Sequence, residues 1–312
     1  MDVTVAVLTF HRNAELAGLL PQLVGEIGAA QKGGGPLSAR VVVVDNDPDR
    51  GAAALVHEIG ADAPVRYVSE PVPGIPAARN RALDEAQPDG ILVFIDDDER
   101  PTAGWLLRML EAHGRFGSAA VSGPVESVFD GPLDPWIANG GFFQRAHRRG
   151  LVTGTAVAAA ATNNLLLDMA VVNRHGLRFD TTLGMAGGED TLFTRRLVAA
   201  GESIIWCAEA VVLDHVSATR MTRAFVLRHV FAQSHASIVA VLRLAPGRWD
   251  QVAVRLRHGL IGLLRVLVGG VQALVGTVLR RDPWQASGLR VAARGLGATA
   301  AVAGVRFEEY RR

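Results

Sequence analysis

Apolar and polar residues alternate in blocks along the first hundred residues of the chain. Short, unbroken runs of valine, isoleucine and leucine are typical of strands buried on both faces, and the stretches between them have helical spacing. The expected strands are 3–9, 40–47, 65–69 and 90–98, and the expected helices are 14–27, 51–60 and 77–87. The run QKGGGP at 31–36 predicts a surface loop. This alternation predicts an α/β fold with a mostly parallel, Rossmann-like central sheet flanked by helices.

The last third of the chain has a different pattern. Residues 221–244 are expected to form an amphipathic helix, and residues 259–279 are apolar except for Arg265. Without that arginine only 14 uncharged residues, 266–279, remain, and a spanning helix needs roughly 20. The final apolar stretch, 286–305, is also interrupted by arginines. The pattern therefore predicts helices with one apolar side.

Charge divides the chain near residue 220. Residues 1–219 carry 17 basic and 27 acidic side chains, a net of −10, whereas residues 220–312 carry 15 basic and 4 acidic ones, a net of +11. This shift predicts a catalytic domain over 1–220 and a helical, basic and apolar membrane-associating region over 221–312. Helices lying in the interface of an anionic membrane fit this composition. A helical hairpin packed on the catalytic domain and a transmembrane hairpin are the alternatives.

The composition says more about the cellular compartment of the protein than about its fold. Half of the 312 residues are apolar, which permits a sizeable core, and Cys207 is the single cysteine. No internal disulfide is possible, so a reducing compartment is expected. The first residues, MDVTVAVLTFHR, lack the features of a signal peptide. The catalytic side is therefore expected to face the cytoplasm.

Polar side chains gather where three of the expected strands end. They are Thr9 to Arg12, Asp45 to Asp47, and Asp96 to Asp98. In a parallel sheet these ends share one edge, where ligands bind. One aspartate after a strand is often a turn former or a helix cap. Three adjacent aspartates instead call for a counter-cation, and hard oxygen ligands suit Mg²⁺ or Mn²⁺ bridging a diphosphate.

Several segments occur in the order seen in a known family. They are VAVLTFHRN, VVVVDND, PGIPAARNRAL, FIDDDE, GGED and the stretch from His215 to Arg220. The chain resembles glycosyltransferase family 2, inverting enzymes of GT-A fold, over residues 3 to about 225. It is most similar to bacterial members that build cell-surface polysaccharides or glycolipids. The resemblance implies a GT-A catalytic domain.

The resemblance assigns the donor side of the site. The aspartate run corresponds to the DXD motif, which implies that Asp98 binds the metal. Asp96 and Asp97 would serve the donor ribose and the metal, with the division between them open. Other positions implied to border the nucleotide are Thr9, Phe10, Arg12, Asp45 at the base (commonly uracil), Arg79 and Asn80. For Arg79, a solvated helix surface is the alternative.

The acceptor side and the chemistry follow from later segments. In ATNNLLLD, Asn163 and Asn164 precede an apolar run that, in relatives, returns to the sheet and lines the site. An inverting transfer needs a base for the acceptor hydroxyl. In the family the aspartate of the ED pair serves, so Asp190 is the expected base and Glu189 would support it. The alternative is an ordinary acidic helix N-terminus.

A final histidine and arginine complete the expected site. His215 follows a strand, where a lone histidine is usually structural, but the resemblance favours metal ligation or diphosphate contact. Arg220 is expected to meet phosphate, because a guanidinium presents a fork of donors to the oxygens. Metal and arginine together would stabilise the departing nucleoside diphosphate.

The sequence thus predicts a metal-dependent inverting glycosyltransferase of the hexosyltransferase type. It would use Mn²⁺ or Mg²⁺ and a nucleotide sugar, by default a UDP-sugar, with a saccharide or lipid-linked acceptor in cell-envelope glycan synthesis. The expected location is the cytoplasmic face of the cell membrane, as a peripheral or monotopic protein on anionic lipid, with no nucleic-acid partner. The alternatives are a sugar nucleotidyltransferase, disfavoured because LTFHRNAEL lacks a glycine-rich activating loop, and a catalytically silent membrane-binding protein.

Overall fold

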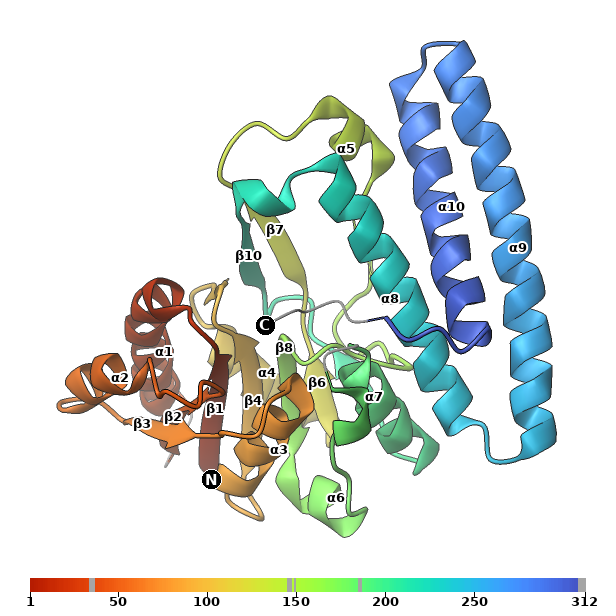
Figure 1. Cartoon of the computed structure of the whole chain (residues 1–312). Helices are drawn as coiled ribbons and strands as arrows, with labels where there is room; N and C mark the ends of the chain where they lie inside the picture. Colours follow the sequence, from red (N-terminus) through yellow and green to blue (C-terminus); the bar gives the residue numbers. More distant parts are fainter. Residues whose placement is uncertain (34–36, 145–147, 149, 185–186, 308–312) are drawn as a thin grey trace. The chain divides into compact units, whose positions relative to one another are not determined.

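The computed structural model describes residues 1–33, 37–144, 148, 150–184 and 187–307. Figure 1 shows the whole chain. Its contacts form two compact units. The first unit is made of Met1–Ser127, Arg148–Gly184 and Phe193–His215, and the second is made of Val128–His147, Met185–Leu192 and Val216–Arg312. The division into domains 1–220 and 221–312 stays a prediction.

A seven-stranded sheet forms the centre of the first unit, with the strand order β3-β2-β1-β4-β8-β6-β9. Its strands are β1 (Asp2–Thr9), β2 (Ser38–Asp45), β3 (Val65–Ser69), β4 (Ile91–Asp96), β6 (Ala120–Ser122), β8 (Asn164–Asp168) and β9 (Ile204–Trp206). Strands β1 to β4 pair in parallel, and β8 runs antiparallel to both β4 and β6. The predicted α/β fold with a mostly parallel sheet is confirmed, and the segment ending at residue 168 returns to the sheet as expected.

Helices cover both faces of this sheet. They are α1 (Asn13–Gly33), α2 (Ala53–Gly60), α3 (Ile75–Glu85), α4 (Trp105–Phe116), α6 (Met169–Arg174) and α7 (Glu189–Ala199), with a 3-10 turn at Thr181–Leu183. Apolar residues alternate between two cores because successive side chains of a strand point to opposite faces. Val93 of β4 joins the core with α1, α2 and α4, whereas Phe94 joins the core with α3, α6 and α7.

Two predicted boundaries differ from the structure for local reasons. The strand expected to reach residue 47 ends at Asp45, whose carboxylate accepts the backbone N–H of Asp47 and closes a turn. The strand expected to reach residue 98 ends at Asp96, and residues 97–98 form a turn into β5 (Glu99–Pro101). Of the loop expected at 31–36, the first three residues still belong to α1 and the rest lie outside the described residues.

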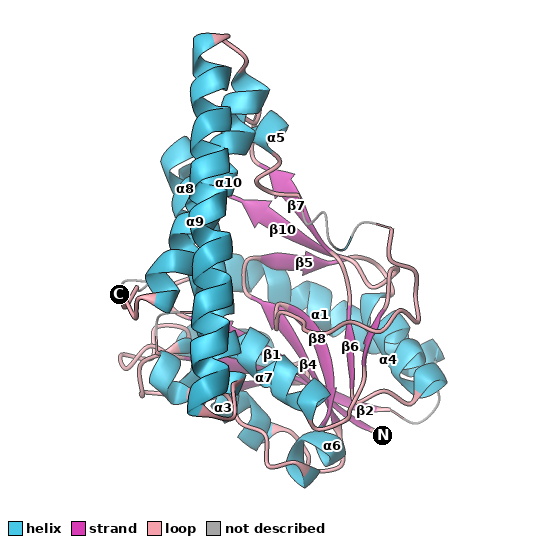
Figure 2. Ribbon diagram, turned by 90° about the vertical axis from the view of Figure 1, so that its right-hand side faces the viewer, coloured by secondary structure: helices cyan, strands magenta, loops and turns pink. Residues whose placement is uncertain are grey.

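A second, three-stranded sheet has the order β5-β10-β7, with β7 at Val125–Phe129 and β10 at Val212–Val216 (Figure 2). Strand β5 leaves the aspartate run and pairs antiparallel with β10. The register places Glu99 opposite Asp214. The chain therefore passes directly from the end of β4 in the first sheet into β5 of this second sheet.

The second unit is mainly helical. Its helices are α5 (Pro135–Gly140), α8 (Arg223–Leu244), α9 (Arg248–Val278) and α10 (Asp282–Val302), with a 3-10 turn at Ala218–Arg220. Helix α10 lies between α8 and α9 (Figures 1 and 2). Among the described residues, α8 and α9 are long and apolar enough to cross a membrane by length and composition. Helix α8 is partly buried within the unit.

Glycines let α9 and α10 approach closely. A Cβ atom at Gly288 would lie 2.4 Å from the backbone nitrogen of Ala273, and one at Gly295 would lie 2.5 Å from the carbonyl oxygen of Gly262. Real Cβ atoms are not found this close to backbone atoms. The backbones of the two helices are therefore in contact along this line, which we call the glycine seam.

Candidate active site

The three polar clusters meet at one edge of the first unit's sheet, as predicted. In the strand register Thr9 lies beside Asp45, and its neighbour Leu8 lies beside Asp96. All three strands run parallel and end together. The carboxyl ends of such strands are where an open α/β sheet binds ligands.

Arg12 joins two members of the aspartate run. Its Nη1 donates to Asp97 Oδ1 at 2.9 Å and to Asp98 Oδ2 at 3.0 Å. The hydroxyl of Thr9 donates to the other oxygen of Asp97 at 2.9 Å. The Asp97 side chain is nearly buried, whereas 20% of the Asp98 side chain is exposed. Asp97 is thus held from two sides, and Asp98 presents its carboxylate to the outside.

Burial and crowding change the protonation of this cluster. Burial raises the pKa of Asp96 to about 7, against the opposing effect of Arg79, and the neighbouring carboxylates add to the rise. Burial likewise raises the pKa of Asp97 to about 6, although Arg12 acts against it. Burial disfavours the Arg12 charge, but Asp97 and Asp98 outweigh it and raise the pKa of Arg12. The carboxylates of the run therefore carry more negative charge than the single positive charge of Arg12 can balance.

Glu99 holds the aspartate run in place through hydrogen bonds of its buried carboxylate, a role that the sequence did not suggest. Its side chain is 2% exposed. One carboxylate oxygen accepts the backbone N–H of Asp96 at 3.3 Å, and the other accepts the amide of Asn163 at 2.8 Å. In the sequence, this role could have been inferred only from the position of Glu99 directly after three aspartates. Asn163 acts on this edge through Glu99, and its predicted acceptor contact stays a prediction.

Asn164 lies in the core. It is 1% exposed; its oxygen accepts from the indole of Trp105 at 2.9 Å, and its nitrogen donates to the carbonyl oxygens of Pro124 and Ala210 at 3.0 and 2.7 Å. Both ends of the amide are thus engaged within the fold. This geometry gives Asn164 a structural role, and a contact with the acceptor stays a prediction.

Replacing Asn164 by alanine should strongly destabilise the first unit. The change leaves the Trp105 indole and two buried carbonyls without this partner, and each such loss costs about 1–3 kcal/mol. We expect a loss of about 3 kcal/mol or more, measured by denaturant unfolding. Asn173→Ala is the control, because Asn173 is exposed and makes one bond, to the Pro88 carbonyl. Equal stability of the two variants would contradict the structural role.

Asp45 is likewise engaged by its surroundings. It is 1% exposed, and its carboxylate accepts from the backbone of Asp47 and Ala52 and from the Tyr67 hydroxyl, at 3.0–3.1 Å. Phe10, one residue after β1, is partly exposed and packs its ring against His11. The predicted contacts of Asp45 with the base and of Phe10 with the nucleotide stay predictions.

Arg79 and Asn80 sit on α3 against the Phe179 segment. Arg79 is 8% exposed, and its guanidinium lies 5.7 Å from the centre of the Phe179 ring. It is therefore not the solvated helix residue that its type suggests, and its charge lowers the pKa of Asp96. The Asn80 amide pairs with both backbone groups of Phe179, each at 2.9 Å. Asn80 thus fixes this segment, and its nucleotide contact stays a prediction.

The remaining predicted site residues are His215, Glu189, Asp190 and Arg220. His215 is an exposed residue of β10 in the first unit, next to the buried Asp214. The boundary between the units falls within α7, so that Glu189, 3% exposed, and Asp190 in its first turn belong to the second unit. Arg220, in the 3-10 turn Ala218–Arg220, belongs to the second unit as well. Met185 and Ala186 of the glycine-rich loop lie outside the described residues. The roles of these residues stay predictions.

The aspartate run is suited to share a cation with a bound diphosphate. Within the described ranges no three His, Cys, Asp or Glu side chains are grouped to hold a metal ion by themselves. Mg²⁺ and related ions, however, commonly use one or two protein carboxylates together with substrate phosphates and water. The partly exposed Asp98 beside Asp96 supplies oxygen donors and excess negative charge. The donor set therefore fits such an ion.

The fold and this edge can be compared with known proteins. A family model described as Glycosyl transferase family 2 matches residues 4–168, more than half of the chain. The chain belongs to glycosyltransferase family 2. It is also 34% identical over 245 residues to the succinoglycan biosynthesis protein ExoM of Rhizobium meliloti (strain 1021), covering 77% of this chain and 76% of that one. The predicted family and enzyme class are thus confirmed.

Solved structures share the fold of this glycosyltransferase. A 1–349 fragment of S. aureus TarS, solved alone and with UDP-GlcNAc, has a TM-score of 0.53 at 15% identity, covering 94% of this chain and 90% of the fragment. GalNAc-T7, solved with UDP, GalNAc and Mn²⁺, has a TM-score of 0.56 at 11% identity, covering 77% of this chain. This chain spans 47% of GalNAc-T7 and 42% of a longer TarS chain. The predicted GT-A fold is confirmed.

Without metal, the contribution of Asp96 to the stability of this glycosyltransferase should fall as pH rises from about 4 to 7. Asp96 has a folded-state pKa of about 7, above the ordinary value of 3.8. The folded state therefore binds the proton more tightly, and its advantage is lost as pH rises towards 7. In EDTA, Asp96→Asn should lose less thermal stability than the wild type over this range. Each kcal/mol corresponds to about 2–4 °C in Tm. Parallel profiles would contradict the burial of a charged Asp96.

Proposed function

We propose that this glycosyltransferase moves a sugar, of the hexose class, from a nucleoside-diphosphate sugar to a hydroxyl of a saccharide or lipid-linked acceptor in cell-envelope glycan synthesis. The observation that carries the proposal is the edge where Thr9, Arg12 and the aspartate run are bonded together at the strand ends. The names of similar proteins support it: ExoM for polysaccharide synthesis, and TarS with UDP-GlcNAc for the donor class. A UDP-sugar is the proposed donor.

The donor would lie along the carboxyl edge of β1, β2 and β4. Thr9, Phe10 and Arg12 border the nucleotide in this proposal, with Asp45 near the base. Arg79 and Asn80 support the same region from α3. Because Arg12 already ties Asp97 to Asp98, it holds both carboxylates in place before the donor arrives. Asp97 and Asp96 are the proposed partners of the ribose hydroxyls.

Asp98, with Asp96 and His215, would hold a Mn²⁺ or Mg²⁺ ion. When bound, the ion supplies positive charge to the diphosphate as that group leaves. Arg220 would contribute a guanidinium fork to the same phosphates. Support comes from the carboxylate excess at β4 and from the Mn²⁺ in the structure of GalNAc-T7.

The transfer itself would be a single displacement with inversion. Asp190 accepts the proton of the acceptor hydroxyl while that oxygen forms its bond to the anomeric carbon. The bond between the anomeric carbon and the diphosphate oxygen breaks, and its electrons leave with the nucleoside diphosphate. Glu189 would orient Asp190, and Asn163 would border the acceptor. No covalent enzyme intermediate is formed.

The proposed location is the cytoplasmic face of the cell membrane, where the protein acts as a peripheral or monotopic enzyme. The net charge of +11 over residues 220–312 suits an anionic membrane surface. A lipid-linked acceptor would be presented at such a surface. The two apolar helices and the similarity to a polysaccharide-synthesis protein support this location.

A panel of nucleotide sugars tests the proposed activity. Purified protein is mixed with UDP-, dTDP- and GDP-sugars in Mn²⁺, Mg²⁺ or EDTA, and donor binding is followed by thermal shift and donor hydrolysis by product release. We expect one donor class to raise Tm and to be hydrolysed only with metal, since ligand binding to the folded state stabilises it. Nucleoside triphosphate with sugar 1-phosphate serves as the control. Turnover of that pair alone would instead establish a nucleotidyltransferase.

A further inference from the structure

The outward side of α9 is an exposed apolar surface. Its large side chains are each between 53% and 72% exposed. They are Leu256, Leu260, Leu263, Leu264, Leu267, Val268, Val271, Leu274 and Val278, and we call them the α9 outer face. Except for two adjacent pairs, Leu263–Leu264 and Leu267–Val268, successive members are three or four residues apart, which places the set on one side of a helix over about 33 Å at 1.5 Å per residue. Single exposed leucines are common, but a continuous face of this size marks a binding surface.

The opposite side of α9 is already occupied. Gly262 and Gly269 are buried in the glycine seam, where a Cβ atom at Gly269 would lie 2.5 Å from the backbone nitrogen of Ala292. Helix α10 in turn packs on α8, with Gly297 against the carbonyl oxygen of Phe231. The hairpin is therefore fixed within the second unit through α10. Its outer face is the part that remains available.

Three arginines lie along the flank of this face and define what we call the arginine triad. Arg290 and Arg294 are one turn apart on α10, and the Cβ atom of Arg265 on α9 lies 2.9 Å from the point where a Cβ atom of Gly295 would stand. Burial, together with the charges of Arg290 and Arg265, lowers the pKa of Arg294. Within the described residues, none of the three forms an ion pair with a carboxylate, although Nη1 of Arg290 donates to the Gly141 carbonyl at 2.7 Å. The triad thus concentrates positive charge beside apolar side chains.

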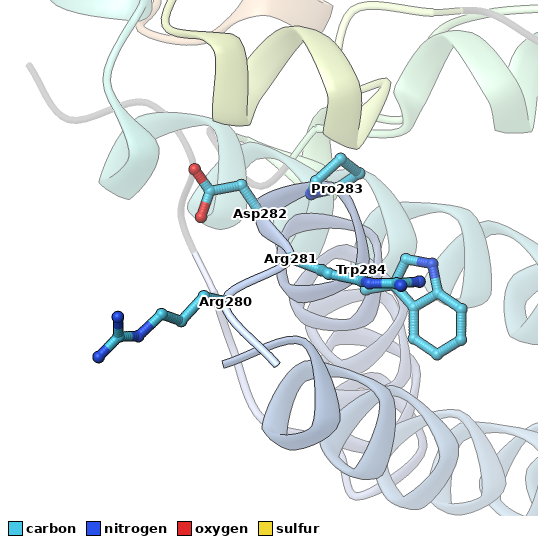
Figure 3. Close-up of a pocket in the computed structure, with 5 residues that line it drawn as sticks. All are labelled: Arg280, Arg281, Asp282, Pro283 and Trp284. Carbon is cyan, nitrogen blue, oxygen red and sulfur yellow. The ribbon is translucent and has the colours of Figure 1, made fainter. Parts of the chain in front are cut away.

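Tryptophans stand at the two ends of the hairpin. Trp249, 83% exposed, lies in the first turn of α9. Trp284, 47% exposed, lies in the pocket at the turn between α9 and α10, with the guanidinium of Arg281 5.9 Å from its ring centre (Figure 3). Tryptophan and arginine both favour the boundary between headgroups and acyl chains. Both ends therefore carry residues suited to that boundary.

From these features we infer that the α9 outer face lies in the plane of an anionic phospholipid bilayer, with the arginine triad binding lipid phosphates at its flank. This inference rests on the membrane location in the proposed function and specifies its surface. Leucine and valine side chains enter the acyl-chain boundary, and guanidinium forks meet phosphate oxygens above it. The charge of the C-terminal region complements an anionic lipid surface and not a second copy with the same charge.

The same features argue against a helix that crosses the bilayer. Arg265, Arg290 and Arg294 all lie near the middle of the hairpin, and charged residues at bilayer centre are costly. A crossing hairpin would also separate α10 from α8, where Ser234 donates to the Arg294 carbonyl at 2.7 Å. An in-plane position keeps this contact and leaves the arginines at headgroup level.

Vesicle binding by the full-length protein tests the inference. The probes are vesicles of phosphatidylcholine alone and of phosphatidylcholine with phosphatidylglycerol, at low and high salt. Leu260→Ser with Leu267→Ser should lower the partition coefficient at least tenfold at both salt concentrations, with unchanged Tm because both side chains are exposed. Arg265→Gln with Arg294→Gln should lower the preference for anionic vesicles by about fivefold for each arginine.

A matched pair of arginines controls for net charge. Arg66→Gln with Arg174→Gln removes two exposed arginines of the first unit, 55% and 63% exposed as side chains. This pair should change binding less than the triad pair does. Equal effects would show that only total charge matters and would overturn the role of the triad. Concentration-dependent dimers that protect the α9 outer face without lipid would overturn the lipid partner.

The depth of α9 in the bilayer distinguishes a helix that lies in the membrane plane from one that spans the membrane. In a Cys207→Ala background, an environment-sensitive dye is attached singly through Leu260→Cys, Leu267→Cys and Leu274→Cys, which lie on the same side two turns apart. An in-plane helix gives one shallow depth at all three positions. A deep signal in the middle with shallow ends would overturn the inference in favour of a spanning helix.

Donor hydrolysis in the same samples separates this inference from the proposed function. Lipid-free protein with Mn²⁺ should hydrolyse its donor at the wild-type rate in all the membrane variants. Hydrolysis without vesicle binding would overturn the α9 surface alone. Vesicle binding without hydrolysis of any donor would contradict the proposed enzyme activity and leave the lipid surface standing.

Discussion

Asp190→Asn is expected to abolish sugar transfer while leaving donor affinity nearly unchanged. Asparagine keeps the size of the side chain and removes its basicity, so the loss falls on the chemical step. A positioned general base typically contributes about 10²–10⁴-fold. Transfer is measured with saturating donor and acceptor, and donor binding is measured by calorimetry with Mn²⁺. A loss of donor binding with normal turnover at saturation would instead make Asp190 a binding residue.

The helix position of Asp190 requires its own control. Asp190 and Glu189 lie in the first turn of α7, where a negative charge stabilises a helix by about 0.3–1 kcal/mol. Glu15→Gln removes the same charge from the first turn of α1. Both variants should lose a similar, small amount of stability. Only Asp190→Asn should lose transfer, which distinguishes a base from a residue that merely begins a helix.

Asp98→Asn is expected to weaken Mn²⁺ binding and to reduce activity at limiting Mn²⁺ by more than about 100-fold. Even partners that only orient a metal ligand are worth about 10–100-fold, and Asp98 is the proposed ligand itself. The fold should remain intact, because the side chain is partly exposed and its bond is to the partly exposed Arg12. Mn²⁺ affinity is measured by calorimetry with donor present.

The expected loss should be partly recovered at high Mn²⁺, because the amide oxygen of asparagine is still a weak ligand. Asp62→Asn, an exposed aspartate in a loop of the same unit, controls for charge. Wild-type turnover of Asp98→Asn at limiting Mn²⁺ would show that the metal, if used, is held elsewhere.

Much of the catalytic fold was predictable because its signals are local. Buried strand segments such as 41–44 and 91–95 consist of unbroken apolar runs, and the parallel pairing of β1, β2 and β4 brings Thr9, Asp45 and Asp96 to one edge. These features depend on the order and periodicity of residues alone. The position of the aspartate run was therefore available from the sequence.

What was not predictable depends on contacts between distant segments. Glu99 receives its role from Asn163, 64 residues later, and Arg79 is buried by the Phe179 segment, 100 residues later. Asn164 precedes an apolar run in NNLLL, and its bonds to Trp105 and Ala210 give it a structural role that the sequence did not indicate. Hydrogen-bond partners at such separations leave no periodic pattern in the sequence.

The C-terminal helices show the same limit. Apolar content predicted helices over 221–244 and 259–279, but not that α9 extends over Arg248–Val278 or that one of its sides is exposed. The glycines within 259–279 and 286–305 gave the available signal, since they occur on the sides by which α9 and α10 approach. Because α9 packs on α10 by one side and exposes the other, a packed hairpin and the proposed membrane-facing helix are compatible.

The glycine seam has a consequence for how this chain can vary among relatives. Positions such as Gly269 and Gly288 admit no larger residue, because any side chain would meet the opposite backbone. The outer positions of α9 need only remain apolar, so leucine, isoleucine, valine, phenylalanine and methionine should interchange there. We therefore expect adjacent residues of one helix to accumulate substitutions at very different rates. Adaptation to membranes of another lipid composition could proceed on one side while the other stays fixed.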